Sequence, residues 1–191
     1  MTKTVGILAL QGDFAEHNQC LQKCEIDTIL VRKSSQLNKI DGLIIPGGES
    51  TAMTKIAQRD NLIEPLKEFT KQNAVWGTCA GLILLADRIQ GQQQIIGGLD
   101  ITVKRNYYGR QLNSFETYID LKSTGIEKLK AKFIRAPKII DVGEEVETLA
   151  SIDDLGQETI VALRQGKILG TTFHSELDSD NRLHRYFVSM L

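Results

Sequence analysis

The sequence lacks a long hydrophobic run. No apolar stretch among the 191 residues approaches the ~20 residues that a membrane-spanning helix requires. The first residues, MTKTVGILALQGD, lead directly into a strand-like segment, so we expect no secretion signal. Cysteine is also scarce, and three thiols cannot all pair with one another. We therefore expect reduced thiols and a cytoplasmic location.

The chain has almost no net charge. The 23 Lys and Arg residues nearly balance the 24 Asp and Glu residues, for a formal net charge of −1. This balance does not favour nucleic acid or an anionic membrane as a partner. The hydrophobic fraction of 41% and the charged fraction of 25% are those of an ordinary globular protein. Because internal repeats and low-complexity linkers are also lacking, we predict a single domain over residues 1–191.

Short apolar runs alternate with amphipathic segments in the first half of the chain, which is the rhythm of βαβ units. We expect strands at residues 5–10, 28–31, 43–45 and 74–76. We expect helices at residues 13–24, 51–72 and 80–89, the second of them broken near residues 60–65. Buried strands in this arrangement form a parallel sheet that is covered by helices on both faces.

The pattern changes after Gln90 to segments that are typical of antiparallel or edge strands. These segments are residues 101–103, 115–121 and 132–134, followed by a hairpin of residues 161–164 and 168–172 around Gln165 and Gly166. Asp180 is expected to cap a last helix that runs to Leu191. The predicted fold is therefore a three-layer α/β structure with a central, mostly parallel sheet, helices on both faces and antiparallel edge strands.

Cys79 lies between an apolar strand and an apolar helix, with Gly77 and Gly81 two residues before and after it. This G-x-C-x-G pattern is typical of a nucleophile elbow, a sharp turn at which small neighbours give the side chain room. The start of the following helix favours a thiolate, and the Ala80 N–H is expected to donate to an oxyanion. A cysteine that merely fills space is the alternative, and the flanking glycines argue against it.

His174 is the expected base. It follows the apolar run 168–173, and loops after the carboxyl ends of parallel strands gather at one sheet edge, where His174 can meet Cys79. Glu176 is placed to accept a hydrogen bond from the second ring nitrogen and so fix the tautomer. The other two histidines are interpreted as structural, His17 packed on the first helix or at its rim and His184 half exposed on the last helix.

The first helix also contains a combination of metal-binding residue types. His17, Cys20 and Cys24 share this segment, but positions 17 and 24 of one helix lie ~10 Å apart along its axis. Two ligands of one zinc ion must each lie within ~2.0 to 2.3 Å of it. We therefore predict neither a metal ion nor another cofactor.

Ser50 is a rival nucleophile. Residues 48–52 come close to the serine elbow G-x-S-x-G, but Ala52 replaces the second glycine. We interpret Ser50 instead as the N-cap of the next helix. The preceding Gly47 and Gly48 then form a loop whose backbone amides can approach a ligand and supply the second oxyanion donor.

Six segments spread over nearly the whole chain carry a specific family resemblance. They are LALQG at 8–12, PGGEST at 46–51, GTCAGL at 77–82, RN at 105–106 with GRQ at 109–111, FIRAP at 133–137 and FHSEL at 173–177. In these segments the chain resembles the glutaminase subunits of pyridoxal 5'-phosphate synthases, which are triad (class I) glutamine amidotransferases. The resemblance implies a flavodoxin-like α/β fold and hydrolysis of L-glutamine to L-glutamate and ammonia through a glutamyl thioester.

The resemblance also implies roles for particular residues and a partner. Cys79, His174 and Glu176 would form the catalytic triad, and Gly48 and Ala80 the oxyanion hole. The implied glutamine contacts are Gly47, Gly48, Glu49, Arg105, Ile134 and Arg135. Ammonia would pass to a barrel-shaped synthase subunit in a large hetero-oligomer, which builds pyridoxal 5'-phosphate from a pentose phosphate and a triose phosphate, and the Gln11-Gly12 loop and first helix would face that subunit.

Two positions bear on the choice of family. Ser175 stands where the family usually has proline, which loosens the backbone between His174 and Glu176. Ile83 stands where amidotransferases of other pathways often have glutamine, which favours the pyridoxal branch. A glutaminase of another pathway remains one alternative. A DJ-1-like cysteine hydrolase or redox protein is another, although it does not explain the segment 46–51, and an inert binding subunit with a buried Cys79 is a third.

Overall fold

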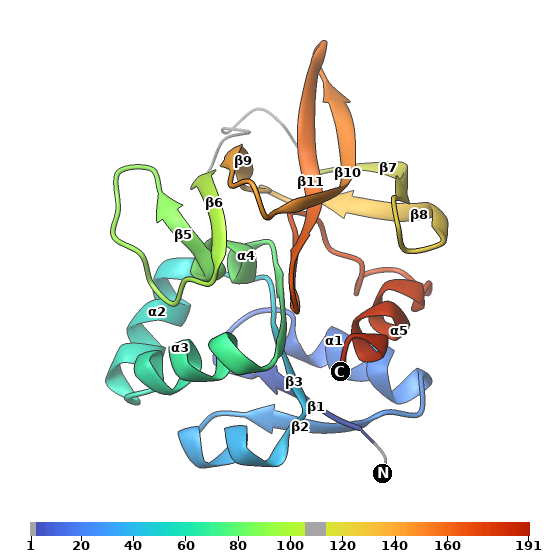
Figure 1. Ribbon diagram of the computed structural model, residues 1–191. Coiled ribbons are helices and arrows are strands. Elements are labelled where there is room, and N and C mark those ends of the chain that lie inside the picture. Colours follow the sequence, from blue (N-terminus) through green and yellow to red (C-terminus); the bar gives the residue numbers. More distant parts are fainter. Residues whose placement is uncertain (1–2, 106–113) are drawn as a thin grey trace.

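The computed structural model describes residues 3–105 and 114–191 (Figure 1). Within this part of the chain, the largest sheet has seven strands in the order β10-β11-β12-β4-β3-β1-β2. Its parallel strands are β1 (Thr4–Leu8), β2 (Asp27–Val31), β3 (Gly42–Ile45), β4 (Ala74–Thr78) and β12 (Ile168–Thr171). Two antiparallel strands extend it, β11 (Gln157–Gln165) and β10 (Glu147–Asp154). The predicted mostly parallel central sheet with antiparallel strands at its edge is confirmed.

Helices cover both faces of this sheet (Figure 1). One face carries α1 (Phe14–Lys23) and α5 (Arg182–Ser189). The other face carries α2 (Ser50–Arg59), α3 (Ile63–Gln72) and α4 (Ala80–Leu85), while a 3-10 helix, η1 (Ser34–Lys39), links β2 to β3. The sheet is therefore the middle of three layers, as the βαβ rhythm predicts.

The alternation of side chains along the central strands gives the molecule two cores. In β3, Leu43 and Ile45 belong to the core beneath α2, α3 and α4, whereas Ile44 belongs to the core beneath α1 and α5. Val75 and Trp76 of β4 divide between the two cores in the same way, and all five side chains are fully buried. Burial of apolar side chains on both faces holds the sheet between its helical layers.

Two smaller sheets extend these cores. β5 (Ala86–Ile89), β6 (Leu99–Lys104) and β9 (Lys138–Val142) form one sheet, which contributes to the core beneath α2 and α3. β7 (Phe115–Leu121) and β8 (Ile126–Phe133) form an antiparallel pair that joins the other core. The strands predicted at 101–103 and 115–121 are confirmed, whereas the strand predicted at 132–134 is only the end of the longer β8.

Some element boundaries differ from the prediction. The helix predicted over 80–89 ends at Leu85, because residues 86–89 pair with β6 as strand β5. A continuous apolar run does not distinguish a buried helix from a buried strand, so the pattern contained no signal for this change. The break predicted near residues 60–65 and the hairpin at the start of β12 are both confirmed.

Two predicted helix caps are wrong. Glu49, rather than Ser50, is the N-cap of α2, because its longer side chain reaches two N–H groups of the first turn at 3.0 and 2.7 Å. Asn181, rather than Asp180, precedes α5. The Asp180 carboxylate nevertheless accepts a hydrogen bond from the backbone N–H of Arg182 at 3.0 Å, and it pairs with the Arg182 guanidinium at 2.6 Å. Asn181 makes no side-chain capping bond, so Asp180 supplies the acceptor from one position further out.

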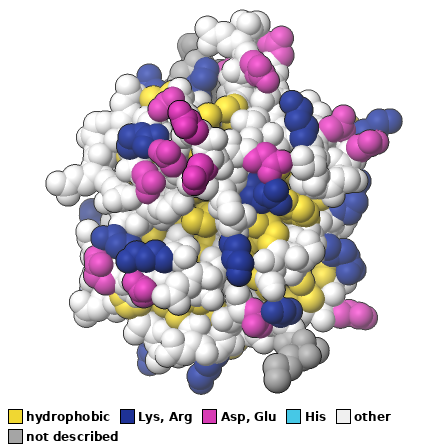
Figure 2. Space-filling view, in the orientation of Figure 1, with side chains coloured by type: hydrophobic (Ala, Val, Ile, Leu, Met, Phe, Trp, Pro, Cys, Tyr) yellow, Lys and Arg dark blue, Asp and Glu magenta, His cyan; other side chains and the backbone are white. Residues whose placement is uncertain are grey.

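Basic and acidic side chains are interspersed over the face of the molecule shown in Figure 2. Exposed pairs such as Lys67 with Glu64 and Lys71 with Glu68 lie one turn apart on α3, at 2.9 and 3.1 Å. Such surface pairs contribute about 0 to 1 kcal/mol each, so the fold depends on its cores rather than on them. In the part of the chain described, every helix is too short or too polar to cross a membrane.

Candidate active site

The loops that follow four neighbouring parallel strands meet at one edge of the central sheet. The strands are β12, β4, β3 and β1, in that spatial order. Their carboxyl ends lead to His174, Cys79, residues 46–49 and residues 9–13, respectively. Open α/β sheets bind ligands at this kind of edge. The fold thus brings together residues that are far apart in the sequence.

Cys79 occupies a strained turn between β4 and α4. Its φ of 48° and ψ of −102° lie in a region that residues other than glycine rarely adopt. The Cys79 N–H donates a hydrogen bond of 2.8 Å to the Thr171 carbonyl of β12, which holds the turn in place. A Cβ on Gly77 would lie 2.7 Å from the backbone of Gly81, and a Cβ on Gly81 would lie 1.9 Å from the Ile45 carbonyl oxygen. Both glycines are therefore required by close backbone packing at the elbow.

The His174 imidazole lies between Cys79 and a buried carboxylate. The Cys79 side chain interacts with the ring and lines the same cavity, and ring Nδ1 lies 2.7 Å from Oε1 of Glu176. The backbone N–H of His174 donates a hydrogen bond of 2.8 Å to the backbone carbonyl of Lys132 in β8. This bond fixes the backbone that carries the ring. A Cβ on Gly47 would lie 2.4 Å from the ring, so only glycine lets the loop after β3 pass so closely. The three side chains have the arrangement of a nucleophile, a base and a group that orients the base.

A second carboxylate faces the same ring nitrogen, and the sequence reasoning missed it. Asp13 Oδ2 lies 3.2 Å from His174 Nδ1, and the Asp13 side chain is 32% exposed. From the sequence, Asp13 was expected only at the start of the first helix. Its position directly after the Gln11-Gly12 loop, at the carboxyl end of β1, was the available signal.

The polar contacts of His174 favour its charged form. Burial alone lowers the pKa of His174, but hydrogen bonds with Asp13, Cys79 and Glu176 outweigh it and raise this pKa to about 12. The imidazole therefore holds a proton at neutral pH, which suits it to stand beside a thiolate. Burial raises the pKa of Glu176, while the hydrogen bond from His174 acts in the opposite direction.

The same polar groups have the composition of a metal site. Asp13, His174 and Glu176 each offer one ligand atom, and these atoms lie within 4.8 Å of one another. Carboxylate oxygens and an imidazole nitrogen suit a divalent cation. The proton on His174 Nδ1 attracts both carboxylates. This attraction accounts for the short distances among the three groups without a metal ion. Among the described residues, His17, Cys20 and Cys24 do not make up a candidate metal cluster.

The loop after β1 interlocks with the loop after β3. The Asp13 N–H donates to the Gly47 carbonyl at 3.0 Å, and Oε1 of Gln11 accepts a hydrogen bond of 2.7 Å from the Glu49 N–H. Gly12 has a φ of 94°, and a Cβ on it would lie 1.8 Å from the Gly47 carbonyl oxygen. The loop after β3, residues 46–49, is called the glycine loop below. Its position beside His174 is therefore set by the loop that carries Asp13.

Glu49 presents its carboxylate at the start of α2. It accepts hydrogen bonds from the N–H groups of Thr51 and Ala52, and these bonds, the one from Thr51 first, hold the pKa of Glu49 below its usual value. Its Oε1 also lies 3.6 Å from Nη2 of Arg105. The carboxylate is therefore ionised at neutral pH and borders the cavity described below.

Arg105 is fixed against the start of α2. Its guanidinium donates to the hydroxyl groups of Ser50 and Thr51, the latter at 2.8 Å, and to Oε1 of Gln92 at 2.6 Å. The Ser50 hydroxyl thus accepts a hydrogen bond from a guanidinium cation. A guanidinium cannot act as the base that would activate Ser50 as a nucleophile. The motif residues 106 and 109–111, which follow Arg105 in the sequence, lie outside the described residues.

A cavity of about 410 Å³ opens at this edge of the sheet. Its walls include Cys79 and His174, and the Cys79 Sγ lies 3.9 Å from the Ile134 carbonyl oxygen. Most of the predicted substrate and oxyanion residues line it as well: Gly48, Glu49, Ala80, Arg105, Ile134 and Arg135. Gly47 packs behind them against the His174 ring. A concave site of this size, lined by both charged and apolar side chains, suits a small polar molecule.

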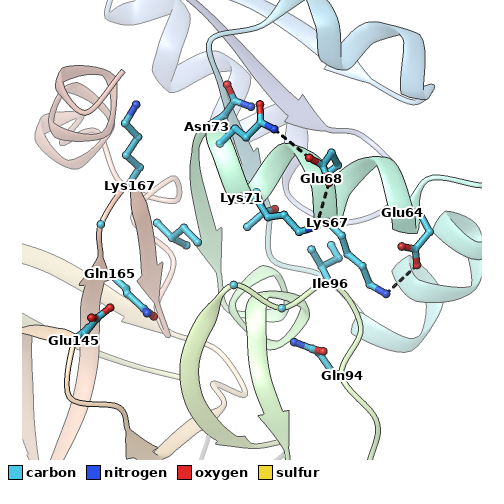
Figure 3. Close-up of a pocket in the computed structure, with 16 residues that line it drawn as sticks. Glu64, Lys67, Glu68, Lys71, Asn73, Gln94, Ile96, Glu145, Gln165 and Lys167 are labelled. Carbon is cyan, nitrogen blue, oxygen red and sulfur yellow. Dashed lines mark hydrogen bonds and ion pairs between the residues drawn. The ribbon is translucent and has the colours of Figure 1, made fainter.

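A larger cavity, of about 660 Å³, lies near the amino ends of β4 and β12 (Figure 3). Much of its rim is formed by residues of α3, where Lys67 pairs with Glu64 and Lys71 pairs with Glu68. The described residues that line it include neither cysteine nor histidine. The side chains suited to nucleophilic chemistry therefore gather in the smaller cavity.

A buried histidine pair lies beneath Glu176. His17 Nε2 is 3.5 Å from Glu176 Oε2, and His17 Nδ1 is 3.0 Å from His184 Nε2. Burial lowers the pKa of His17 well below its usual value and that of His184 to about 4, so both rings are neutral. The packed position expected for His17 is confirmed. The half-exposed position expected for His184 is wrong, because this face of α5 packs on Trp76, with ring centroids 4.9 Å apart.

The chain is similar to known proteins over almost its whole length. A family model described as the SNO glutamine amidotransferase family matches residues 7–191. A Geobacillus thermodenitrificans protein named pyridoxal 5'-phosphate synthase subunit PdxT is 48% identical over 98% of this chain and 94% of its own. A protein of Arabidopsis thaliana named as a probable subunit of the same synthase is 45% identical over 98% of this chain and 85% of its own. A crystal structure titled as a glutamine amidotransferase has a TM-score of 0.90 at 42% identity and covers 97% of each chain.

Proposed function

The chain belongs to the SNO glutamine amidotransferase family, and on that premise we propose that it is the glutaminase subunit of a pyridoxal 5'-phosphate synthase. In the proposed reaction, a single domain of residues 1–191 hydrolyses L-glutamine to L-glutamate and ammonia. The catalytic triad is Cys79, His174 and Glu176. One observation carries the proposal: a cysteine on a strained elbow and an imidazole that a buried carboxylate holds line the wall of one small cavity.

The first chemical step is attack on the side-chain amide of glutamine. The Cys79 thiolate adds to the amide carbon, and the carbonyl oxygen becomes an oxyanion. The N–H of Ala80, at the start of α4, and the N–H of Gly48 donate to that oxyanion. His174 holds the proton that the thiol has given up, and the two carboxylates beside Nδ1 stabilise the resulting imidazolium.

The second step expels ammonia, and the third restores the enzyme. His174 gives its proton to the departing nitrogen, the carbon–nitrogen bond breaks, and a glutamyl thioester remains on Cys79. The neutral imidazole then takes a proton from water, whose oxygen attacks the thioester carbonyl. The carbon–sulfur bond breaks, glutamate leaves, and the thiolate and imidazolium are regenerated.

Charged groups at the cavity wall match the two ends of the glutamine backbone. The α-carboxylate would pair with Arg135 or Arg105, since guanidinium groups bind carboxylates well. The α-ammonium group would lie beside Glu49, whose carboxylate is ionised. Gly47 and Ile134 complete the predicted contacts, Gly47 as part of the glycine loop and Ile134 through its backbone beside the sulfur.

Ammonia requires a partner if it is to act as a nucleophile, because free ammonia is protonated in water. The relatives' names connect them with pyridoxal 5'-phosphate synthase. We therefore propose delivery of ammonia through a shielded path to a barrel-shaped synthase subunit in a hetero-oligomer. The Gln11-Gly12 loop and α1 are the proposed docking elements, because that loop also holds the glycine loop beside His174.

The test of this function is ammonia release from glutamine in the presence of the synthase subunit. Cys79→Ala should lose at least about a thousandfold in rate, as expected when a nucleophile is removed. Cys24→Ala is the matched control, because it removes a buried thiol outside the cavity and should retain the wild-type rate. A retained rate in Cys79→Ala would overturn the site assignment. Mass spectrometry after treatment with an electrophilic glutamine analogue tests the alternative class. Sulfinic oxidation of Cys79 without an adduct of the analogue would favour the DJ-1-like redox class.

A further inference from the structure

One oxygen of Glu176 has no hydrogen bond among the described residues. Oε1 is hydrogen-bonded to Nδ1 of His174 at 2.7 Å. Oε2 is buried and has no hydrogen-bond partner among the described residues. His17 of α1 directs its Nε2 toward that oxygen from 3.5 Å. A buried carboxylate oxygen needs positive charge or a donor nearby, since desolvation of an anion is costly. The protonation state of His17 Nε2 therefore bears on the charge of Glu176.

The partners of His17 restrict where its proton can lie. Nε2 also lies 3.3 Å from the Thr78 hydroxyl oxygen, and Nδ1 lies 3.0 Å from Nε2 of His184. The Nδ1 of His184 is buried without a partner among the described residues. Trp76, which packs against both rings, donates its own N–H to Thr171 at 3.1 Å and so is committed elsewhere.

Two neutral arrangements of this chain of groups are possible, and they differ in free energy. With the proton on Nε2 of both histidines, His184 donates to His17, and His17 donates toward Glu176 and Thr78. The only cost is a bare lone pair on His184 Nδ1. With the proton on Nδ1 of both, a lone pair of His17 faces the Glu176 carboxylate, and His184 buries an N–H without an acceptor. Repulsion and an unpaired donor both disfavour the second arrangement.

We infer that His17 is a positioning residue of the proposed glutaminase, which orients Glu176 and keeps it ionised by presenting Nε2–H to Oε2. His184 fixes the tautomer of His17 by donating from its own Nε2. The line of groups runs from α5 through α1 to the triad, and every member of it is buried. The chemical role rests on the proposed function, whereas the tautomers are a property of the resting protein.

The titratable groups around Glu176 are few. His174 faces Oε1 and His17 faces Oε2, while Asp13 approaches from the loop after β1 and raises the pKa of Glu176. The Cys20 thiol of α1 contacts the Glu176 backbone carbonyl at 3.7 Å rather than the carboxylate. Loss of the His17 donor should therefore raise the pKa of Glu176, with His174 and the backbone N–H of Glu176 left to oppose that change.

NMR of the ring nitrogens tests the tautomers without any change to the site. The 191-residue chain, with ¹⁵N-labelled imidazoles, contains three histidines to assign. Nitrogen shifts that report neutral rings protonated at Nε2 for His17 and His184 are expected. A neutral His17 protonated at Nδ1, or a cationic His17, would overturn the inference.

Kinetics of two His17 variants test the role. His17→Leu fills similar space without a donor, and we expect kcat for glutamine to fall about ten- to hundredfold, because a donor 3.5 Å from a buried charged oxygen is removed. KM should change little, because His17 does not line the cavity. The acid limb of the pH profile should move to higher pH as the pKa of Glu176 rises. His17→Gln, whose amide can accept from His184 and donate to Glu176, should recover most of the rate and the original profile.

Trp76→Phe is the matched packing control. It disturbs the same buried cluster and removes the hydrogen bond to Thr171, but it leaves Glu176 and its neighbours in place. Equal loss of kcat in Trp76→Phe and His17→Leu, with unshifted pH profiles, would reduce His17 to a structural role. If His17→Leu keeps the wild-type rate while Cys79→Ala is inactive, the inference fails and the glutaminase stands. If the wild type with its synthase releases no ammonia, the proposed function fails instead.

Discussion

At the scale of single residues, the unusual feature is one imidazole nitrogen with two carboxylates beside it. His174 Nδ1 lies 2.7 Å from Glu176 and 3.2 Å from Asp13. The two acids are not equivalent, because Glu176 is buried whereas Asp13 is partly exposed. Glu176 thus supplies a fixed orientation, and Asp13 adds charge from the loop that also holds Gly47.

Asp13→Asn should lower the pKa of His174 from its value of about 12, because a carboxylate that stabilises the imidazolium is lost. A raised folded-state pKa stabilises the protein fully below the unfolded value, near 6.5, and this contribution fades as pH rises toward the folded value. The variant should therefore be less stable than wild type at neutral pH, by about 1 kcal/mol. NMR titration of the His174 ring and denaturant unfolding measure the two effects.

Glu16→Gln provides the comparison for this prediction, since Glu16 is a nearby acid in the first turn of α1 that does not contact His174. It should leave the titration of His174 unchanged. An unchanged titration in Asp13→Asn as well would show that the charge of Asp13 is screened by solvent and does not act on the imidazole.

The residues at the site differ in how well the sequence predicted them. The meeting of Cys79 and His174 in one cavity could be predicted, because each follows a buried strand and carries a local signal, namely flanking glycines or a polar residue after an apolar run. Asp13 and His17 could not be assigned roles in this way, because their significance depends on which loop and helix pack beside β12. The half-exposed position expected for His184 failed for the same reason, since the polar neighbour Arg185 gives no sign of burial against Trp76.

At the scale of secondary-structure elements, the elbow depends on close backbone contact between β3, β4 and α4. The contact is tightest at Gly81, where a Cβ would lie 1.9 Å from the Ile45 carbonyl oxygen. No side chain can rotate to relieve this clash, because both groups belong to the backbone. The helix start that places Cys79 would have to shift.

Gly81→Ala should therefore reduce both stability and activity. Overpacking of this kind costs about 1 to 3 kcal/mol, and displacement of α4 should lower kcat further because the Ala80 N–H moves. Thermal unfolding and ammonia release measure the two effects. Gly125→Ala serves as a control: its φ of 74° makes alanine unfavourable, but no atom lies within 4 Å of the new Cβ. It should cost about 1 kcal/mol and leave kcat unchanged.

A different result would be informative about the elbow. If Gly81→Ala unfolded like Gly125→Ala and kept full activity, the close contact with β3 would not control the position of Cys79. The glycines of the G-x-C-x-G pattern would then need another explanation.

The order of the helices and parallel strands could be predicted from the sequence, because each element has a clear hydrophobic period and a turn signal between it and the next. The change from α4 to β5 could not, because residues 80–89 form one apolar stretch and the strand is defined by pairing with β6. Strands β9 and β10 were also missed. Their burial is one-sided and partial, so the apolar signal in each is weak.

At the scale of the whole molecule, the loops of the site are held by one another, by the edge of the central sheet and, at His174, by β8. The glycine loop receives its contacts from Gln11, Gly12 and Asp13, which also form the proposed docking loop. A partner that binds this loop would therefore act directly on the proposed oxyanion donor Gly48 and on the environment of His174.

Glutamine hydrolysis by the purified chain should accordingly be slow alone and faster, by about tenfold or more, once the synthase subunit is added, which would correspond to about 1.4 kcal/mol of transition-state stabilisation. Steady-state ammonia release at saturating glutamine, with increasing amounts of the subunit, measures this effect. Bovine serum albumin at equal concentration controls for nonspecific protein effects. Equal rates with and without the synthase would remove the claim of activation by the partner.

The most direct test of the central claim is to trap the covalent intermediate. The chain and its synthase subunit are mixed with glutamine, quenched in acid during steady turnover, and examined by intact-protein and peptide mass spectrometry. The account predicts a mass increase of one glutamyl group on the peptide that contains Cys79, and no such adduct in Cys79→Ala. Ammonia release without that adduct, or an adduct on Cys20 or Cys24 instead, would contradict it.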